Sequence, residues 1–164
     1  MARAALDRLK LERIVFMPTG APRYREPAVA SGQQRVAMLE LALEGEPRYV
    51  IDARELKPGA SGYTVDTLKE LRSELGPELW LLVGADQYTK LDTWYRPDEV
   101  RELASIGVFA RPGVALDKAT EVIPMKTLKI SSSDVRARIA RGESISDLVP
   151  PAVANYIARE RLYV

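Results

Sequence analysis

Hydrophobic residues recur along the chain in two alternating patterns, one typical of helices and one typical of strands. Within residues 64–75, Val65, Leu68 and Leu71 fall on a single helical face. Residues 78–83 instead form a nearly continuous apolar run, as expected of a strand that helices cover on both faces of a sheet. With caps, prolines and glycines as boundaries, the pattern predicts helices over residues 2–11, 31–44, 64–75, 97–103, 132–141 and 151–161, and strands over residues 13–17, 48–52, 78–83, 106–110 and 121–123.

The alternation of helices and strands is typical of α/β proteins. We therefore expect an open, mostly parallel sheet with helices on both faces. The length of 164 residues predicts a single domain spanning residues 1–164. Ligands of such sheets bind at the carboxyl ends of the strands, so the loops that follow Met17, Val83 and Ala110 are the expected positions of a site.

Composition narrows the chemistry of that site. The chain contains 24 Lys and Arg against 23 Asp and Glu, so its bulk charge indicates neither a nucleic acid nor a membrane as partner. It contains no Cys and no His, which excludes disulfides, thiolate catalysis, His bases and zinc sites built on these residues. A metal would need oxygen ligands, which favours Mg²⁺, and the sequence assigns no protein ligand to it.

No targeting or membrane segment is recognisable in the sequence. The first ten residues carry charges with no apolar run behind them, and apolar stretches such as residues 79–83 are too short to span a bilayer. We therefore expect a cytoplasmic protein, and the sequence leaves a homo-oligomer open.

Three hydroxyl residues precede the helix predicted over 132–141. Ser131, Ser132 and Ser133 lie where free backbone N–H groups and the positive end of the helix dipole attract anions, and Arg136 follows within one turn. Because an arginine fork grips phosphate oxygens, this pattern favours phosphate binding. The alternative is an ordinary helix cap, since Ser and Asp are common there.

Two further segments follow predicted strands. Gly84 and Asp86 come directly after the apolar strand, where glycine admits a ligand and a carboxylate can accept from ribose hydroxyls. The alternative is a turn in which Asp86 caps the next helix. Trp94 is suited to stacking on a flat heteroaromatic ring, or else packs in the core. The proline-rich segment 18–25 carries arginines that either bind phosphate or are simply solvated.

Taken in order, the motifs of the chain resemble those of one family over nearly the whole sequence, the bacterial nicotinate-nucleotide adenylyltransferases. The matching segments are Pro-x-Gly-x-Pro (18–22), Gln-Arg-x-x-Met-Leu-x-Leu-Ala (34–42), Tyr-Thr-Val-Asp-Thr-Leu (63–68), Gly-Ala-Asp (84–86), Thr-Trp (93–94), Arg-Pro-Gly (111–113), Ile-Ser-Ser-Ser-x-Val-Arg (130–136) and Leu-Val-Pro-Pro-x-Val-x-x-Tyr-Ile (148–157). The resemblance implies the Rossmann-like nucleotidyltransferase fold. It also implies transfer of AMP from ATP, with Mg²⁺, to nicotinate mononucleotide, which gives deamido-NAD and pyrophosphate.

The resemblance also implies roles for particular residues. The implied ATP-binding residues are Gly84, Asp86, Arg111, Ser131, Ser132, Ser133 and Arg136, with Arg136 and Ser132 as the catalytic pair. The implied mononucleotide-binding residues are Arg25, Thr64, Trp94 and Tyr95, with the Trp94 ring on the pyridine.

The family pattern is incomplete at the N-terminus of the chain. The family begins with a strand, a glycine-rich turn and a His-x-Gly-His motif, whereas these 164 residues contain no His. We therefore expect the first strand to be missing, the sheet to have a gap between the strands at 13–17 and 78–83, and this chain alone to be a weak enzyme. Two other functions stay open, a related adenylyltransferase such as the pantetheine-phosphate enzyme and a non-catalytic nucleotide-binding module.

Overall fold

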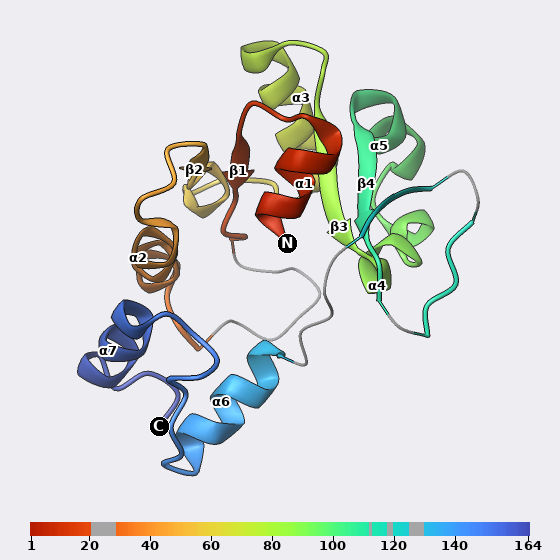
Figure 1. The fold of residues 1–164 in the computed structure, drawn as a ribbon. Helices are drawn as coiled ribbons and strands as arrows, with labels where there is room; N and C mark the ends of the chain where they lie inside the picture. Colours follow the sequence, from red (N-terminus) through yellow and green to blue (C-terminus); the bar gives the residue numbers. More distant parts are fainter. Residues whose placement is uncertain (21–28, 112, 118–119, 125–129) are drawn as a thin grey trace. The chain divides into compact units, whose positions relative to one another are not determined.

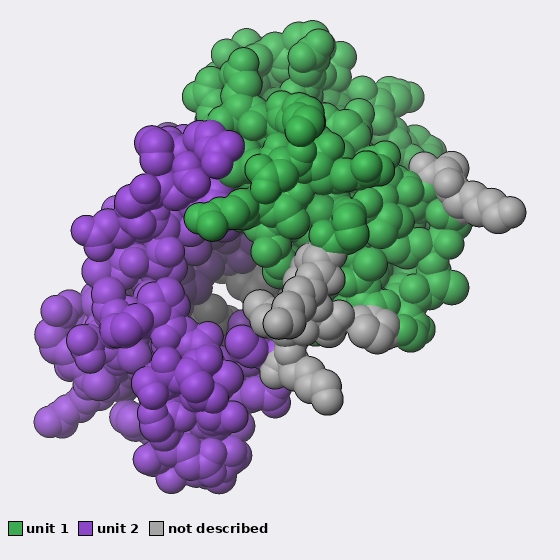
Figure 2. Space-filling view, in the orientation of Figure 1, with its two compact units in different colours: residues 1–14, 61–127 green, residues 15–60, 128–164 purple. Residues whose placement is uncertain are grey.

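The computed structural model describes residues 1–20, 29–111, 113–117, 120–124 and 130–164 (Figure 1). They form two compact units, coloured separately in Figure 2. Unit 1 comprises Met1–Ile14 and Ser61–Thr127, and unit 2 comprises Val15–Ala60 and Leu128–Val164. Each unit is therefore built from two stretches of sequence. The single domain expected from the length stays a prediction.

A three-stranded parallel sheet forms the centre of unit 1. Its strands are β3 (Trp80–Gly84), β4 (Ser105–Phe109) and β5 (Glu121–Ile123), hydrogen-bonded in that order. Figure 1 shows β3 and β4 side by side, with the carboxyl end of β3 leading into α4. The parallel sheet predicted from the alternating pattern is confirmed.

Helices cover both faces of this sheet. They are α1 (Ala2–Leu9), α3 (Thr64–Leu75), the short α4 (Ala85–Tyr88), α5 (Pro97–Leu103) and the 3₁₀ turn η2 (Leu91–Thr93). On one face, Leu81 and Ile106 pack against a core that includes Val65 of α3 and Val100 of α5. On the other face, Gly107 lies under Leu9 of α1. The prediction of helices on both faces is therefore confirmed.

Unit 2 is mostly helical. Its elements are β1 (Ile14–Phe16, which begins on the last residue of unit 1), α2 (Gly32–Leu43), β2 (Tyr49–Ile51), the 3₁₀ turn η1 (Arg54–Leu56), α6 (Ser132–Ala140) and α7 (Pro151–Arg159). β1 pairs with β2 in a sheet of their own. A second core forms where α2, α6 and α7 meet, around the buried residues Ala30, Ile145, Val153, Ile157 and Leu162.

Most predicted elements occur, several of them shorter at one or both ends. In contrast, β3 ends at Gly84 rather than at residue 83, and β4 spans Ser105–Phe109 rather than residues 106–110. The helix predicted over 2–11 stops at Leu9 because Lys10 adopts a left-handed conformation, with φ 55°. The helix predicted over 151–161 stops at Arg159, two residues before Arg161, which is also left-handed. Gly142, with φ 71°, follows the end of α6 as the sequence predicts. Helix ends are less certain than helix positions because the last turn has few packing contacts to fix it.

The capping box predicted at the start of α2 is present. The Gln34 amide donates to Ser31 Oγ at 3.2 Å, and the Ser31 amide donates to Gln34 Oε1 at 2.9 Å. The strands of the described residues fall into two sheets, with β1 in one and β3 in the other. The sequence predicts an interruption of the sheet between these two strands, and the further strand of the family stays a prediction. No described helix is both long enough and apolar enough to cross a membrane.

Candidate functional site

The carboxyl ends of β3 and β4 lie next to each other, because the two strands are parallel and in register from Trp80 with Ser105 to Gly84 with Phe109. This arrangement brings Asp86, just beyond β3, into an ion pair with Arg111, just beyond β4, in which Arg111 Nη1 donates to Asp86 Oδ2. Both side chains are about half exposed. A carboxylate and a guanidinium are thus presented to solvent at the strand ends, where α/β sheets bind ligands.

Gly84, rather than Asp86, is the N-cap residue of α4. The alternative that Asp86 caps the following helix is therefore wrong. A Cβ atom added at Gly84 would meet no described atom within 4 Å, and its φ of −75° is open to any residue. Neither packing nor backbone conformation requires glycine there, which leaves close approach of a ligand as a reason for it.

The aromatic segment after η2 lies beside the N-terminus of α3. Trp94 is partly buried and packs against the two cores of unit 1, one around Leu91 and Val100 and the other around Val83 and Val108. Part of the Trp94 side chain therefore packs in the core, as the alternative to ligand stacking predicts. Tyr95 is 53% exposed, and its ring lies against the ring of Tyr63, with the ring centres 4.4 Å apart.

The Tyr63–Tyr95 contact brings two backbone amides into one region of unit 1. Thr64 is the first residue of α3, whose N-cap Tyr63 provides no side-chain cap. Among the described residues, no hydrogen-bond acceptor is found for the Thr64 amide or the Tyr95 amide. Two N–H donors next to a partly exposed indole suit a flat ring that carries a carboxylate.

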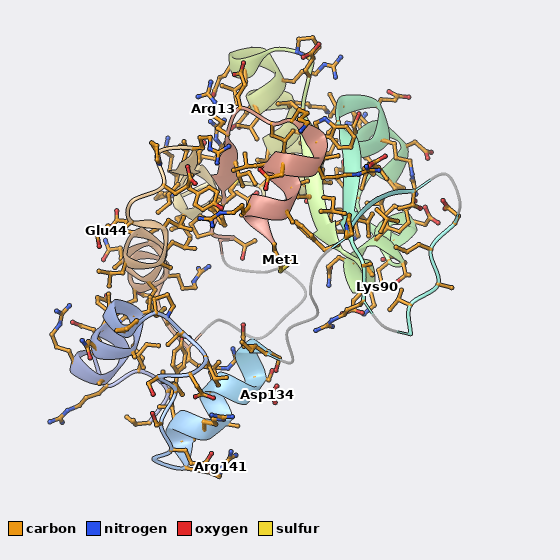
Figure 3. All side chains as sticks on the ribbon, in the orientation of Figure 1. Met1, Arg13, Glu44, Lys90, Asp134 and Arg141 are labelled. Atoms are coloured by element: carbon orange, nitrogen blue, oxygen red, sulfur yellow. The ribbon has the colours of Figure 1, made fainter. Side chains whose placement is uncertain are left out.

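The serines predicted to bind phosphate occupy the start of α6. Ser131 is the N-cap, where its Oγ accepts from the Asp134 amide at 3.1 Å and donates to the Asp134 carboxylate at 2.6 Å. Ser131 itself is therefore an ordinary helix cap, as the alternative predicts. Ser132 and Ser133 are exposed in the first turn, and Arg136 Nη2 donates to Ser133 Oγ at 3.3 Å. Figure 3 labels Asp134 at the beginning of α6 and Arg141 beyond its end.

The arginines of α6 differ in their partners. Arg138 donates to Asp147 at 3.1 Å, and Arg141 donates to Glu143 at 2.6 Å. The hydrogen bond from Arg141 lowers the pKa of Glu143, which keeps this exposed carboxyl ionised. Arg136, in contrast, has no carboxylate partner in the described part of the chain. Of the three, Arg136 is the guanidinium available to an anion.

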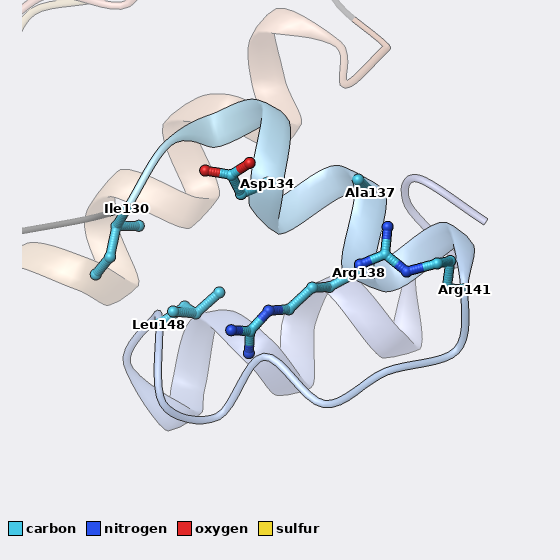
Figure 4. Close-up of a pocket in the computed structure, with 6 residues that line it drawn as sticks. All are labelled: Ile130, Asp134, Ala137, Arg138, Arg141 and Leu148. Carbon is cyan, nitrogen blue, oxygen red and sulfur yellow. The ribbon is translucent and has the colours of Figure 1, made fainter.

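A shallow hollow of about 290 Å³ lies between α6 and the segment that follows it (Figure 4). Its lining includes Asp134, Arg138, Arg141 and Leu148. Both of its arginines are already neutralised by carboxylates, so it offers an anion less than Arg136 does.

Two residues of interest were not singled out from the sequence. Tyr63 supports Tyr95 through its ring, and no periodic pattern indicates a contact between loops so far apart in the chain. Arg35 has a buried Nε with no hydrogen-bond partner. Arg35 lies three residues before Met38, which packs on the core of unit 2. This helical spacing is the signal in the sequence that could have indicated that Arg35 lies near the same face of the helix. Arg25 lies outside the described residues.

The fold and these strand-end residues define a nucleotide-binding α/β protein. The model of the cytidylyltransferase-like family matches residues 1–138, and the chain belongs to this family. More specifically, curated relatives along the whole chain carry the name probable nicotinate-nucleotide adenylyltransferase. The protein from Laribacter hongkongensis is 40% identical over 189 residues, covering 99% of this chain and 86% of the relative. The one from Bordetella petrii is 36% identical, covering 99% and 89%.

Solved structures give the same fold. The Plasmodium falciparum nicotinic acid mononucleotide adenylyltransferase complexed with NaAD superposes with a TM-score of 0.79 at 16% identity, covering 98% of this chain and 89% of that one. The same protein complexed with APC gives a TM-score of 0.71 at 18% identity. The family resemblance and the α/β fold predicted from the sequence are confirmed, and the chain is a nucleotidyltransferase by family.

Proposed function

We propose that this protein transfers AMP from ATP to nicotinate mononucleotide, giving deamido-NAD and pyrophosphate. The observation that carries the proposal is the 40% identity, over 99% of this chain, to a relative named for that activity. The geometry of unit 1 supports it, because Trp94 and two unpaired amides lie together there. The pantetheine-phosphate alternative is not favoured, since it gives no role to this aromatic region.

Unit 1 is proposed to bind the two ring systems. The Trp94 indole stacks on the pyridine, and the Thr64 and Tyr95 amides donate to the nicotinate carboxylate. On the ATP side, Gly84 leaves room for the adenosine, while Asp86 accepts from a ribose hydroxyl and Arg111 holds Asp86 in place. Arg25 is proposed as a further contact to the mononucleotide.

Unit 2 is proposed to bind the phosphates of ATP. The N–H groups at the start of α6, the hydroxyls of Ser131, Ser132 and Ser133, and the Arg136 fork all donate to phosphate oxygens. Negative charge grows on the pyrophosphate as it leaves, so donors at this position stabilise the transition state more than the ground state. Arg136 and Ser132 are the proposed catalytic pair.

The reaction requires no general base. A phosphate oxygen of the mononucleotide forms a bond to the α-phosphorus of ATP, and the bond from that phosphorus to the bridging oxygen breaks, which releases pyrophosphate. A phosphate monoester has its second pKa near about 6 and is therefore already deprotonated at neutral pH. A chain with no His can in this way still carry the chemistry, by positioning and by charge.

Magnesium is proposed to enter bound to ATP. Among the described residues no group of three or more Asp or Glu side chains could hold a metal, so the ion fits the phosphates better than the protein. When bound, it neutralises phosphate charge. The cytoplasm is the proposed location, and a homo-oligomer is compatible with the proposal.

The test measures binding and turnover on the purified chain. Calorimetry with nicotinate mononucleotide and with MgATP should give saturable binding of each, and deamido-NAD and pyrophosphate should accumulate, even slowly, only when both are present. Nicotinamide mononucleotide and pantetheine phosphate replace the mononucleotide as control acceptors. Pyrophosphate released only with pantetheine phosphate would point to the related enzyme. Binding of both nucleotides with no product would point to a non-catalytic module.

A matched pair of variants connects activity to the proposed site. Arg136→Gln should remove most turnover, because Arg136 is the α6 arginine with no carboxylate partner. Arg141→Gln removes the same charge from a position just after α6 where Glu143 already neutralises it, and should leave turnover close to that of the native chain. Equal losses in the two variants would mean that bulk charge, and not the Arg136 fork, matters.

A further inference from the structure

The turn that joins η2 to α5 contains a residue in a strained conformation. Arg96, the N-cap of α5, has φ 55° and ψ 59°, in the left-handed region that costs energy for a residue with a Cβ atom. Pro97 follows it, and a proline restricts the preceding residue further towards extended backbone. The local sequence therefore disfavours this conformation, and contacts from elsewhere in unit 1 must hold it.

Glu99, in the first turn of α5, makes two such contacts. Its Oε2 lies 2.8 Å from Arg96 Nε, and its Oε1 lies 2.9 Å from Lys69 Nζ of α3. The Glu99 side chain is 24% exposed, whereas the Arg96 side chain is 51% exposed. One partly buried carboxylate thus connects the strained residue to a second helix.

This ion pair differs from an ordinary surface pair between neighbouring turns of a helix, which contributes little to stability. Glu99 Oε2 is buried and accepts no hydrogen bond from the described residues, so its charge depends on the nearby cations of Arg96 and Lys69. Lys69 also belongs to α3, which packs on α5 through the core around Val65 and Val100. The carboxylate is therefore held in place from two elements.

The strained residue directly follows the aromatic part of the candidate site, Trp94 and Tyr95. The Arg96 carbonyl accepts from the Val100 amide at 3.2 Å, which fixes the turn to α5. A change of φ and ψ at Arg96 would redirect the chain on its N-terminal side relative to that helix. It would therefore move the indole and the Tyr95 amide relative to the Thr64 amide, which faces the same region.

We propose that Glu99 is a positioning residue for the pyridine side of the site. It holds Arg96 in the left-handed conformation and fastens the turn to α3 through Lys69. Trp94 and the Tyr95 amide then keep the places that a flat ring with a carboxylate needs. That the turn serves nicotinate mononucleotide rests on the proposed function. That Glu99 holds the turn does not.

The experiment compares four variants of the full chain. Glu99→Gln keeps the shape of the side chain and removes its charge, and Glu102→Gln removes the same charge from an exposed position of the same helix as the matched control. Arg96→Gly removes the Cβ atom, and with it the part of the conformational cost that comes from the side chain. The fourth variant combines Arg96→Gly with Glu99→Gln. Calorimetry measures the Kd for nicotinate mononucleotide and for MgATP, and hydrogen exchange measures the opening of the Val100 amide without ligand.

Glu99→Gln should raise the Kd for nicotinate mononucleotide by about 5- to 30-fold, the equivalent of a left-handed residue that is no longer held, and leave the Kd for MgATP unchanged. Without ligand, the Val100 amide should exchange faster by a similar factor. Glu102→Gln should change none of these quantities. Arg96→Gly, alone or combined with Glu99→Gln, should keep the Kd for the mononucleotide within about threefold of the native value.

The rescue by Arg96→Gly separates positioning from other roles. An equal loss of affinity from Glu99→Gln with and without Arg96→Gly overturns the proposal, because Glu99 would then act by another route. A large loss in Arg96→Gly alone also overturns it, because the Arg96 guanidinium would then contact the ligand itself. A lower Tm with unchanged Kd and unchanged exchange makes Glu99 a structural residue.

The exchange measurement keeps the two proposals apart. A native chain that does not bind nicotinate mononucleotide refutes the proposed function. In that chain, faster exchange of the Val100 amide in Glu99→Gln, and not in Glu102→Gln, still supports the hold of Glu99 on the turn, and equal exchange in the two variants overturns it.

Discussion

Two glycines at the sheet of unit 1 can be exchanged for alanine with opposite expected results. Gly107, in β4, is buried under side chains: an added Cβ would lie 2.9 Å from Leu82 Cδ2, 3.0 Å from Ile123 Cδ1 and 3.2 Å from Leu9 Cδ1. Gly84, at the end of β3, would meet no described atom within 4 Å. The same chemical change therefore tests packing at one position and ligand approach at the other.

The sizes of the two effects follow from these distances. Contacts below about 3.4 Å must relax by moving three side chains, and overpacking of a core costs about 1–3 kcal/mol. For a chain of this length the Tm of Gly107→Ala should fall by about 2–12 °C. Gly84→Ala should change stability by less than about 0.5 kcal/mol, since the φ of −75° suits alanine. If adenosine lies against Gly84, the methyl group should weaken MgATP binding by about 5- to 150-fold.

Thermal unfolding and calorimetry on both variants separate the two effects. Gly107→Ala should lose stability and, below its Tm, bind MgATP with the affinity of the native chain. Gly84→Ala should show the reverse. A Gly84→Ala variant that binds MgATP normally would refute the reasoning that Gly84 is there to admit the nucleotide. A Gly107→Ala variant with an unchanged Tm would show that Leu82 and Ile123 can move at little cost.

Three further results are expected. Trp94→Leu keeps apolar packing but removes the stacking surface, so the Kd for nicotinate mononucleotide should rise by about 5- to 150-fold while the Kd for MgATP stays the same. Calorimetry measures both Kd values, and equal changes in the two would assign Trp94 to the core alone. Arg136→Lys keeps the charge but loses the planar fork, so the rate of pyrophosphate release should fall while Tm is unchanged; normal turnover would make Arg136 a surface charge. Burial raises the pKa of Tyr163 in the folded state. The stability that the protonated hydroxyl contributes is therefore fully present below about pH 10, the pKa of an unfolded tyrosine, and is lost as the pH rises through the pKa of the folded state. The free energy of unfolding should therefore fall less steeply between about pH 9 and about pH 11 for Tyr163→Phe than for the native chain. An equal dependence on pH in the two proteins would contradict this.

The elements that the sequence predicts best are those with local signals. The helix over 64–75 is found with the predicted bounds, because its apolar stripe faces one core and Gly76 ends it. Pro97 begins α5 as expected, since its fixed φ and missing N–H suit the first turn. The Ser31 capping box needs only four neighbouring residues to form.

What the sequence could not show depends on contacts between distant segments. The short helix α4 and the turn η2 have no periodic pattern of their own. Tyr88, the last residue of α4, and Trp94, which follows η2, pack against the core around Val83 and Val108. The Asp86–Arg111 pair forms because β3 and β4 run in parallel register, which composition does not encode. The burial of the Arg35 Nε atom likewise follows from tertiary packing.

The pairing of α2 with α7 has a consequence for how the chain is made. The two helices contact each other in unit 2, although α2 spans residues 32–43 and α7 spans residues 151–159. During synthesis the apolar side of α2 leaves the ribosome long before its partner exists, while the segments of unit 1 between them are already able to fold. Unit 2 can therefore be completed only after residues 151–159 have been synthesised, and a premature stop before Pro151 would leave the apolar side of α2 without α7.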